Sequence, residues 1–232
     1  MKEKLVGFKK QGFNLLITLL LSIQVILSVF ISMKLTKFEK AGLVLNQDIP
    51  QSPQYIEDVS IDDDPMIGNP KSSVIVIEFG DYQCPFCKES ERSIKRILDE
   101  YKEKIAFVYR DFPLDSHPYA YNAAIASNCA NEQGYFWEVR DLLYEYQEDI
   151  KGNDSLLDLV REIPFDHDKF RQCLLDQKYK NEILNDIEDG KKYQVNGVPT
   201  FFINGYHIEG GSYEQIKLLI EQQMNWYYEK RG

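Results

Sequence analysis

The chain has 232 residues and a formal net charge of -10. Residues 1–40 hold seven basic and two acidic side chains, so the remainder of the chain carries a charge of -15. This acidity argues against nucleic acid as a partner and against adhesion to anionic lipid. After the N-terminal segments, about 165 residues are left, which suits one domain with a single hydrophobic core.

The first expected element is a transmembrane helix at residues 13–33. These 21 residues include no charged side chain, and about 20 apolar residues suffice to cross a bilayer. We expect an uncleaved signal anchor that follows a cytoplasmic N-terminus at residues 1–12, because no convincing small-x-small cleavage site is present. A cleaved signal peptide is the alternative. The orientation does not follow from basic residues, since four lysines precede the span and three follow it.

An extracytoplasmic tether is expected at residues 34–57, before a folded domain at residues 58–232. Residues 41–70 lack helical periodicity and hold several proline, glycine and aspartate residues, as is typical of linkers and turns. One edge strand is expected around residues 56–61.

A strand followed by a helix carries the most informative motif, Cys84-Pro85-Phe86-Cys87. The apolar run at residues 74–77 predicts a buried strand, and apolar residues at helical spacing predict a helix from residue 88 to 101. Cys84 would be the N-cap and Pro85 the first helical residue, where the missing N–H costs nothing. Free backbone N–H groups and the helix dipole favour Cys84 as an exposed, reactive thiolate. Cys87, one turn on, can close a disulfide with it.

Half of a zinc knuckle is the alternative for this cysteine pair. Zinc would need further ligands at a short spacing, and the remaining cysteines and histidines do not have that spacing. We therefore expect a redox pair and no metal site.

Glu78 lies on the predicted strand, six residues before Cys84. A carboxyl group buried there would have a raised pKa and could relay a proton to or from Cys87. The alternative is a charge at the end of the strand that reaches water.

A second core strand is expected at residues 105–112, and the pattern from 119 to 187 is almost entirely helical. This helical region contains Cys129 and Cys173 among apolar neighbours. Outside the cytoplasm these two cysteines could form a structural disulfide, and two separately buried thiols are the alternative.

The C-terminal part predicts a hairpin and a final helix. Asn204-Gly205 between two apolar runs is a strong hairpin signal. Pro199 opens the first of these strands, a place where a cis bond is tolerated, but spacing alone does not identify one. Ser212 and Gln215 form a capping box for the last helix. Its buried stripe is expected to consist of Ile216, Leu219, Ile220 and Met224.

Three separated motifs resemble the DsbA-like branch of the thioredoxin superfamily. They are FGDYQCPFC at residues 79–87, QGYFW at 133–137 and GVPTF at 197–201. The resemblance runs from about residue 58 to residue 227. It implies an α/β thioredoxin-like fold with a helical insertion at about residues 116–190, here preceded by one N-terminal transmembrane helix.

The resemblance also implies roles for individual residues. Cys84 would be the nucleophile and Cys87 the resolving thiol, with an acid at the Glu78 position. Val198-Pro199 would form a cis-proline loop against the active site, where substrates bind. Some relatives carry a second cysteine pair in the insertion, and Cys129 and Cys173 would be that pair in this chain.

One departure concerns the two residues that tune the active site. Strongly oxidising members have Pro-His between the cysteines, whereas this chain has Pro85-Phe86. The resemblance therefore leaves the oxidising strength open.

The sequence thus predicts a membrane-anchored, extracytoplasmic thiol-disulfide oxidoreductase without a cofactor. We expect it to introduce disulfides into unfolded or folding exported polypeptides. By resemblance, a quinone-linked membrane partner of the DsbB or vitamin K epoxide reductase type would reoxidise it. The alternatives are a disulfide reductase or isomerase and, in a different class, a tethered binding or chaperone module.

Overall fold

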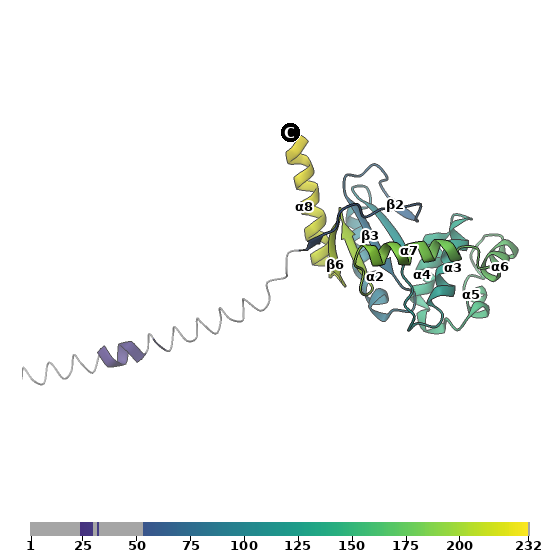
Figure 1. The fold of residues 1–232 in the computed structure, drawn as a ribbon, viewed down its shortest axis with the longest axis horizontal. Coiled ribbons are helices and arrows are strands. Elements are labelled where there is room, and N and C mark those ends of the chain that lie inside the picture. The colour runs from purple at the N-terminus through teal and green to yellow at the C-terminus, as the bar shows by residue number, and fades with distance from the viewer. Residues whose placement is uncertain (1–23, 30–31, 33–52, 232) are drawn as a thin grey trace, which may run out of the picture. The chain divides into compact units, whose positions relative to one another are not determined.

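The computed structural model describes residues 24–29, 32 and 53–231. The chain divides into two compact units, Met1–Ser52 and Pro53–Gly232, and the second unit holds the sheet and its helices (Figure 1). Residues 24–29 are helical. The expected span at 13–33 and the tether at 34–57 lie largely outside the described residues. Among the residues that are described, no helix has the length and apolar character needed to traverse a bilayer.

A six-stranded sheet forms the centre of the second unit, in the order β1-β6-β5-β3-β4-β2. Its strands are β1 (Gln54–Tyr55), β2 (Met66–Gly68), β3 (Ile75–Gly80), β4 (Ala106–Asp111), β5 (Thr200–Ile203) and β6 (Tyr206–Glu209). β3 and β4 are parallel, and the other neighbouring strands are antiparallel. The two core strands expected at residues 74–77 and 105–112 are confirmed as β3 and β4, and each has a neighbouring strand on both sides.

The prediction of an edge strand at residues 56–61 is wrong in its position. The edge strand is β1, which begins two residues before residue 56 and pairs with β6. Residues 56–61 form a turn and irregular backbone. Asp58 has a φ of 56°, a left-handed conformation that ends an extended strand. The apolar side chains of Ile56, Val59 and Ile61 instead pack against the core from this loop. β2 then forms the opposite edge, beside β4.

The helices of the second unit are α2 (Pro85–Tyr101), α3 (Ala120–Asn131), α4 (Phe136–Glu145), the 3-10 helix η1 (Gln147–Asp149), α5 (Asn153–Leu159), α6 (His167–Leu175), α7 (Lys180–Lys192) and α8 (Tyr213–Arg231). They form two groups, one packed against the sheet and one in the chain segment between β4 and β5. Ile94 of α2 and Ile216 of α8 share one core with Phe107 and Phe201 of the sheet. The helices α3 to α7 all lie between β4 and β5 in the chain, which makes them the expected insertion (Figure 1).

Local signals explain the C-terminal elements. Asn204 and Gly205 have φ angles of 47° and 86° between β5 and β6, as a tight hairpin turn requires. The Ser212 N–H donates to Gln215 Oε1 at 2.9 Å, and the Gln215 N–H donates to Ser212 Oγ at 3.3 Å. This reciprocal pair is the predicted capping box, and it starts α8.

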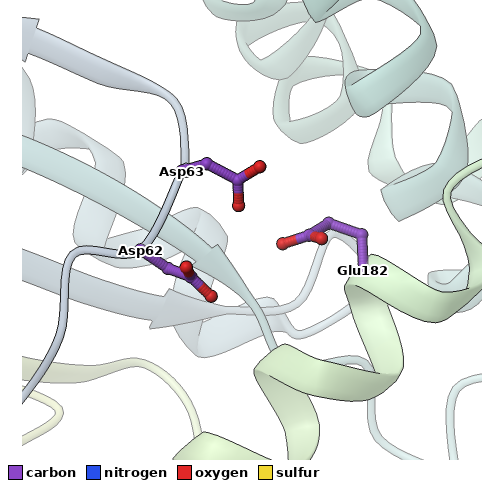
Figure 2. A group of neighbouring side chains, drawn as sticks. All are labelled: Asp62, Asp63 and Glu182. Atoms are coloured by element: carbon purple, nitrogen blue, oxygen red, sulfur yellow. The ribbon is translucent and has the colours of Figure 1, made fainter.

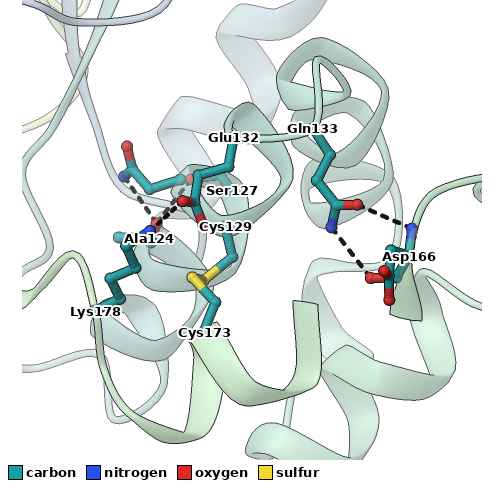
Figure 3. The surroundings of a disulfide bond; sticks show 9 residues. Ala124, Ser127, Cys129, Glu132, Gln133, Asp166, Cys173 and Lys178 are labelled. Carbon is teal, nitrogen blue, oxygen red and sulfur yellow. Dashed lines mark hydrogen bonds and ion pairs between the residues drawn. A yellow bond between two sulfur atoms is a disulfide. The ribbon is translucent and has the colours of Figure 1, made fainter. Parts of the chain in front are cut away.

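Cys129 of α3 and Cys173 of α6 form a disulfide inside the insertion, with their Cα atoms 5.8 Å apart (Figure 3). Nearby, Gln133 accepts a hydrogen bond from the Asp166 N–H at 2.9 Å and donates to the Asp166 carbonyl at 3.2 Å. Both contacts join the turn after α3 to the N-cap of α6. The disulfide closes a loop across a sequence separation of 44 residues, so it restricts the unfolded chain strongly.

We predict that the double substitution Cys129→Ala, Cys173→Ala lowers the free energy of unfolding by about 4 kcal/mol, the loop-entropy value for a loop of this length. Denaturant unfolding measures this loss. The reactivity of Cys84 towards alkylating reagents should stay as in the parent. Mass spectrometry of the non-reduced protein that finds both cysteines as free thiols would contradict the prediction.

Candidate active site

The corner between β3 and α2 positions the cysteine pair. Cys84 is the N-cap of α2 and Pro85 occupies its first turn. The Cys84 N–H donates to the Asp81 carbonyl at 3.1 Å. Gln147 of η1 is buried and donates its amide to the carbonyls of both Tyr82 and Cys84, each at 2.9 Å. The insertion therefore holds this corner from the inside.

Cys84 and Cys87 are both free thiols, and their acidities differ widely. A hydrogen bond from the Cys87 thiol, the largest cause, and the backbone N–H groups of Cys87 and Phe86 lower the pKa of Cys84 to about 6. Burial and the charge of Asp81 oppose this shift. Burial, followed by the hydrogen bond to Cys84 and the charge of Glu78, raises the pKa of Cys87. Cys84 is thus the thiolate near neutral pH, and Cys87 keeps its proton.

The expectation of an exposed Cys84 is wrong, because only 3% of this residue is accessible. Its Sγ lies 3.4 Å from the carbonyl oxygen of Val198, on the loop before β5. Phe86 is 68% exposed. The Val198 carbonyl thus lies against the sulfur, and the exposed Phe86 ring follows two residues later in the sequence.

The Val198–Pro199 peptide bond is cis. Thr200 donates its hydroxyl to the Gly197 carbonyl at 2.7 Å, and the Gly210 N–H donates to the Pro199 carbonyl at 2.8 Å. A groove of about 740 Å³ lies beside this loop. Its lining includes Phe86, Ser90, Arg92, Pro199, Gly210 and Ser212.

Glu78 is fully buried, so the alternative of a strand-end charge in water is wrong. Its Oε2 accepts a hydrogen bond from Arg140 Nη2 at 2.8 Å, and its Oε1 is buried without a hydrogen-bond partner. Burial, the largest cause, raises the pKa of Glu78 to about 8. Arg140 lowers this pKa, and Glu91 raises it.

Sequence reasoning missed Arg140 and Glu91, the two residues that surround the Glu78 carboxyl group. Arg140 lies on the buried face of α4 with Phe136 and Leu143, and it is 2% exposed. A basic residue within an apolar stripe was the available signal, since buried charges are rare unless paired.

Two acidic groups are the places in the described chain where carboxylates gather closely enough to hold a cation. Figure 2 shows Asp62 and Asp63, from the loop before β2, pointing into the same space as Glu182 of α7. Asp64 and Asp186 form the second group with Glu182, and the ligand atoms in each group lie within 4.8 Å of one another. Acidic clusters of this kind are common without an ion.

Arg110 of β4 offsets part of this negative charge. Its buried guanidinium lies 2.8 Å from Asp64, 2.6 Å from Asp186 and 3.1 Å from Asp189. Burial, the largest cause, and the charge of Asp186 raise the pKa of Asp64 to about 10, whereas Arg110 lowers it. The cluster thus ties the loop before β2 to β4 and α7.

Comparison with known proteins places the chain in a family. A family model described as Thioredoxin matches residues 60–222. The Na⁺/H⁺ antiporter NhaA 3 of Salinispora tropica is 37% identical over 153 residues, which are 66% of this chain and 23% of the antiporter. The chain therefore spans less than a quarter of that relative. A probable disulfide bond formation protein D of Bacillus anthracis is 26% identical over 168 residues, or 68% of this chain and 77% of that protein.

Solved structures have the same fold. Oxidised BdbD from Bacillus subtilis superimposes with a TM-score of 0.66 at 25% identity, over 75% of this chain and 97% of BdbD. The thiol-disulfide exchange protein α-DsbA2 from Wolbachia pipientis gives a TM-score of 0.65 at 23% identity, over 72% of this chain and 90% of α-DsbA2. The expected thioredoxin-like α/β fold with a helical insertion is thereby confirmed. The chain belongs to the thioredoxin family, in its DsbA-like branch.

Proposed function

We propose that this protein is a thiol-disulfide oxidoreductase that introduces disulfide bonds into exported polypeptides. The observation that carries the proposal is the unequal cysteine pair, in which Cys84 has a pKa of about 6 and Cys87 stays protonated. A thiolate is both the attacking and the leaving species in disulfide exchange. A stabilised Cys84 thiolate favours the reduced form of the protein, and so it makes the disulfide form an oxidant.

The reaction begins from the Cys84–Cys87 disulfide. A substrate thiolate attacks Cys84 Sγ, the bond between the two cysteines breaks, and its electron pair stays on Cys87. A second substrate thiolate then attacks the substrate sulfur of the mixed disulfide, and Cys84 leaves as a thiolate. The substrate gains a disulfide, and the protein ends in its dithiol form.

Glu78 is proposed as the proton carrier for Cys87. The charge of Glu78 acts on Cys87, and a carboxyl group with a pKa of about 8 is largely protonated at neutral pH. It can supply the proton that Cys87 takes when it leaves the disulfide.

Substrates would bind along the cis-proline loop and its groove. An extended segment can form backbone hydrogen bonds with the loop at Val198, next to the Cys84 sulfur. The exposed ring of Phe86 adds an apolar surface at the same place. Backbone pairing and one apolar contact select little by sequence, which suits a protein that acts on many unfolded chains.

The proposal includes the cellular setting. We place the catalytic domain on the extracytoplasmic side of the membrane, held by a signal anchor at residues 13–33, because disulfides persist in oxidising compartments. A quinone-linked membrane protein of the DsbB or vitamin K epoxide reductase type would reoxidise the cysteine pair. No cofactor of the protein's own is required.

We predict that Cys87→Ala accumulates mixed disulfides with exported polypeptides, since the resolving thiol is missing. Cys84→Ala should trap none, because the buried, protonated Cys87 is a poor nucleophile. Non-reducing electrophoresis of the two variants, with the double variant as the control, measures the trapped species. Equal trapping by both single variants would contradict the assignment of Cys84 as the nucleophile.

The pH dependence of Cys84 alkylation gives a second prediction. The rate with iodoacetamide in the reduced protein should be half-maximal near pH 6, where Cys84 ionises. Removal of the Cys87 thiol donor by Cys87→Ala should move this midpoint to higher pH, because the largest lowering cause is lost. A midpoint near the ordinary thiol value of about 8.5 in the parent protein would refute the proposed activation.

We also predict that Phe86→His makes the protein a stronger oxidant. An imidazole in the first turn of α2 can stabilise the Cys84 thiolate, and the exposed Phe86 ring leaves room for the exchange. The reduction potential should rise by about 30 mV for each 1.4 kcal/mol gained, together with a fall in the Cys84 pKa. Phe86→Gln, which cannot carry a charge, is the matched control. An unchanged or lower potential in a folded Phe86→His variant would show that this position does not tune the site.

A further inference from the structure

A buried carboxyl group and a partly exposed imidazole meet beside the strand-to-helix corner. Asp81 directly follows β3, and its side chain has no exposed surface. His117 belongs to the loop between β4 and α3, and 22% of its side chain is exposed. Its Nδ1 lies 2.7 Å from Asp81 Oδ2. Because Asp81 precedes Cys84 by three residues, this pair is part of the cysteine corner, and the reaction steps proposed above do not use it.

The Asp81 carboxylate connects two segments of the chain. Its Oδ1 accepts a hydrogen bond from the Gln83 N–H at 2.6 Å, the pattern of an aspartate turn. Its Oδ2 accepts from the Leu114 N–H at 2.8 Å and also faces the imidazole of His117. Three nitrogen groups directed at one buried carboxyl group favour its charged form. Since a carboxylate can only accept hydrogen bonds, Nδ1 of His117 carries a proton and donates it to the bond.

The loop that carries His117 is fixed on both sides of the imidazole. Before it, Leu114 is bound to Asp81, and the His117 N–H donates to the Leu114 carbonyl at 2.9 Å. After it, the Tyr119 N–H donates to Gln83 Oε1 at 2.6 Å. The imidazole is therefore held at the carboxylate by hydrogen bonds to the same turn that precedes the cysteine pair.

The charge of Asp81 works against the ionisation of Cys84. The two residues are in contact, since the Cys84 N–H donates to the Asp81 carbonyl at 3.1 Å. The hydrogen bond from Cys87 is the largest cause that lowers the pKa of Cys84 to about 6, whereas burial and the Asp81 charge raise it. A like charge disfavours a second anion nearby. The corner is thus built on a carboxylate that repels the thiolate it positions.

The other ionisable groups around Asp81 do not offset this charge. Asp111, at the end of β4, is a second acid, and burial is the largest cause that raises its pKa, with Asp81 among the charges that add to the rise. In the described part of the chain, the titratable or charged groups that face Asp81 are Asp111 of β4, His117 in the loop after β4 and Cys84 at the start of α2. Of these three, His117 is the one that can carry a positive charge.

We propose that His117 is a positioning residue that balances the charge of Asp81 and thereby keeps Cys84 in its thiolate form. When the imidazole is protonated, the pair has no net charge, so the carboxylate can hold the corner without repelling the thiolate. The exposed part of the ring lets it exchange protons with water, while Asp81 stays sealed. The consequence for disulfide exchange rests on the proposed function, in which the Cys84 thiolate is the leaving group.

The test is the pH midpoint of Cys84 alkylation by iodoacetamide in the reduced full-length protein, followed by mass spectrometry of the peptide that contains Cys84. His117→Gln keeps an N–H donor for Asp81 but cannot carry a charge, so the midpoint should rise by about half a pH unit or more. His117→Arg places a permanent positive charge beside the same carboxylate. Its midpoint should equal that of the parent or lie below it.

His167→Gln is the matched control, because it makes the same exchange at an exposed position of α6. Its midpoint should stay as in the parent. A merely structural role of His117 would lower the melting temperature of the Gln and Arg variants, and it would not separate their alkylation midpoints.

Asp81→Asn tests whether His117 acts through Asp81. Removal of the repelling charge should lower the Cys84 midpoint. In this background, His117→Gln should shift the midpoint by less than it does in the parent, since coupled residues are not additive.

A His117→Gln midpoint that equals the control or falls overturns the proposal, and so does a His117→Arg midpoint as high as that of His117→Gln. If His117→Gln does not fold, His117→Arg decides, and a midpoint above that of the parent has the same consequence. A protein that exchanges no thiols with polypeptides would refute the proposed function, whereas the alkylation midpoints would still report whether His117 controls Cys84.

Discussion

The hydrogen bond from the Cys87 thiol to the Cys84 thiolate is the interaction on which the proposed chemistry depends. It is the largest cause that lowers the pKa of Cys84, and it requires Cys87 to keep its proton. Full burial of Cys87 ensures this, because the interior disfavours a second thiolate. The backbone N–H groups at the start of α2 then add to the stabilisation of Cys84. One cysteine is therefore prepared to attack, and the other is prepared to close the disulfide.

The helical insertion is part of this site rather than a separate attachment. Gln147 holds the carbonyls at the strand-to-helix corner, and Arg140 supplies the cation that β3 and its neighbouring strands lack beside Glu78. The Cys129–Cys173 disulfide joins two helices of the same insertion. The insertion thus supplies buried polar side chains both to the strand-to-helix corner and to Glu78.

Local signals in the sequence were sufficient for the elements that carry the cysteines. Proline after Cys84 marks the helix start, and Asn204-Gly205 marks the hairpin, because each acts through its own backbone. The partners of Glu78 escaped prediction, since Arg140 lies 62 residues away and only the packing of α4 brings it near. The carbonyl group that contacts the Cys84 sulfur belongs to Val198, which lies 114 residues away in the sequence. Sequence spacing carries no information about contacts of this kind.

We propose that the surroundings of Cys84 stabilise the reduced form of this protein more than those of the active-site cysteine do in a reductant such as thioredoxin. The most direct test is the equilibrium of the Cys84–Cys87 pair against a glutathione buffer. We expect a reduction potential distinctly above about -270 mV, the thioredoxin value, and a potential above about -150 mV would mark a strong oxidase. A potential at or below about -270 mV would contradict the claim, and it would identify the protein as a reductant.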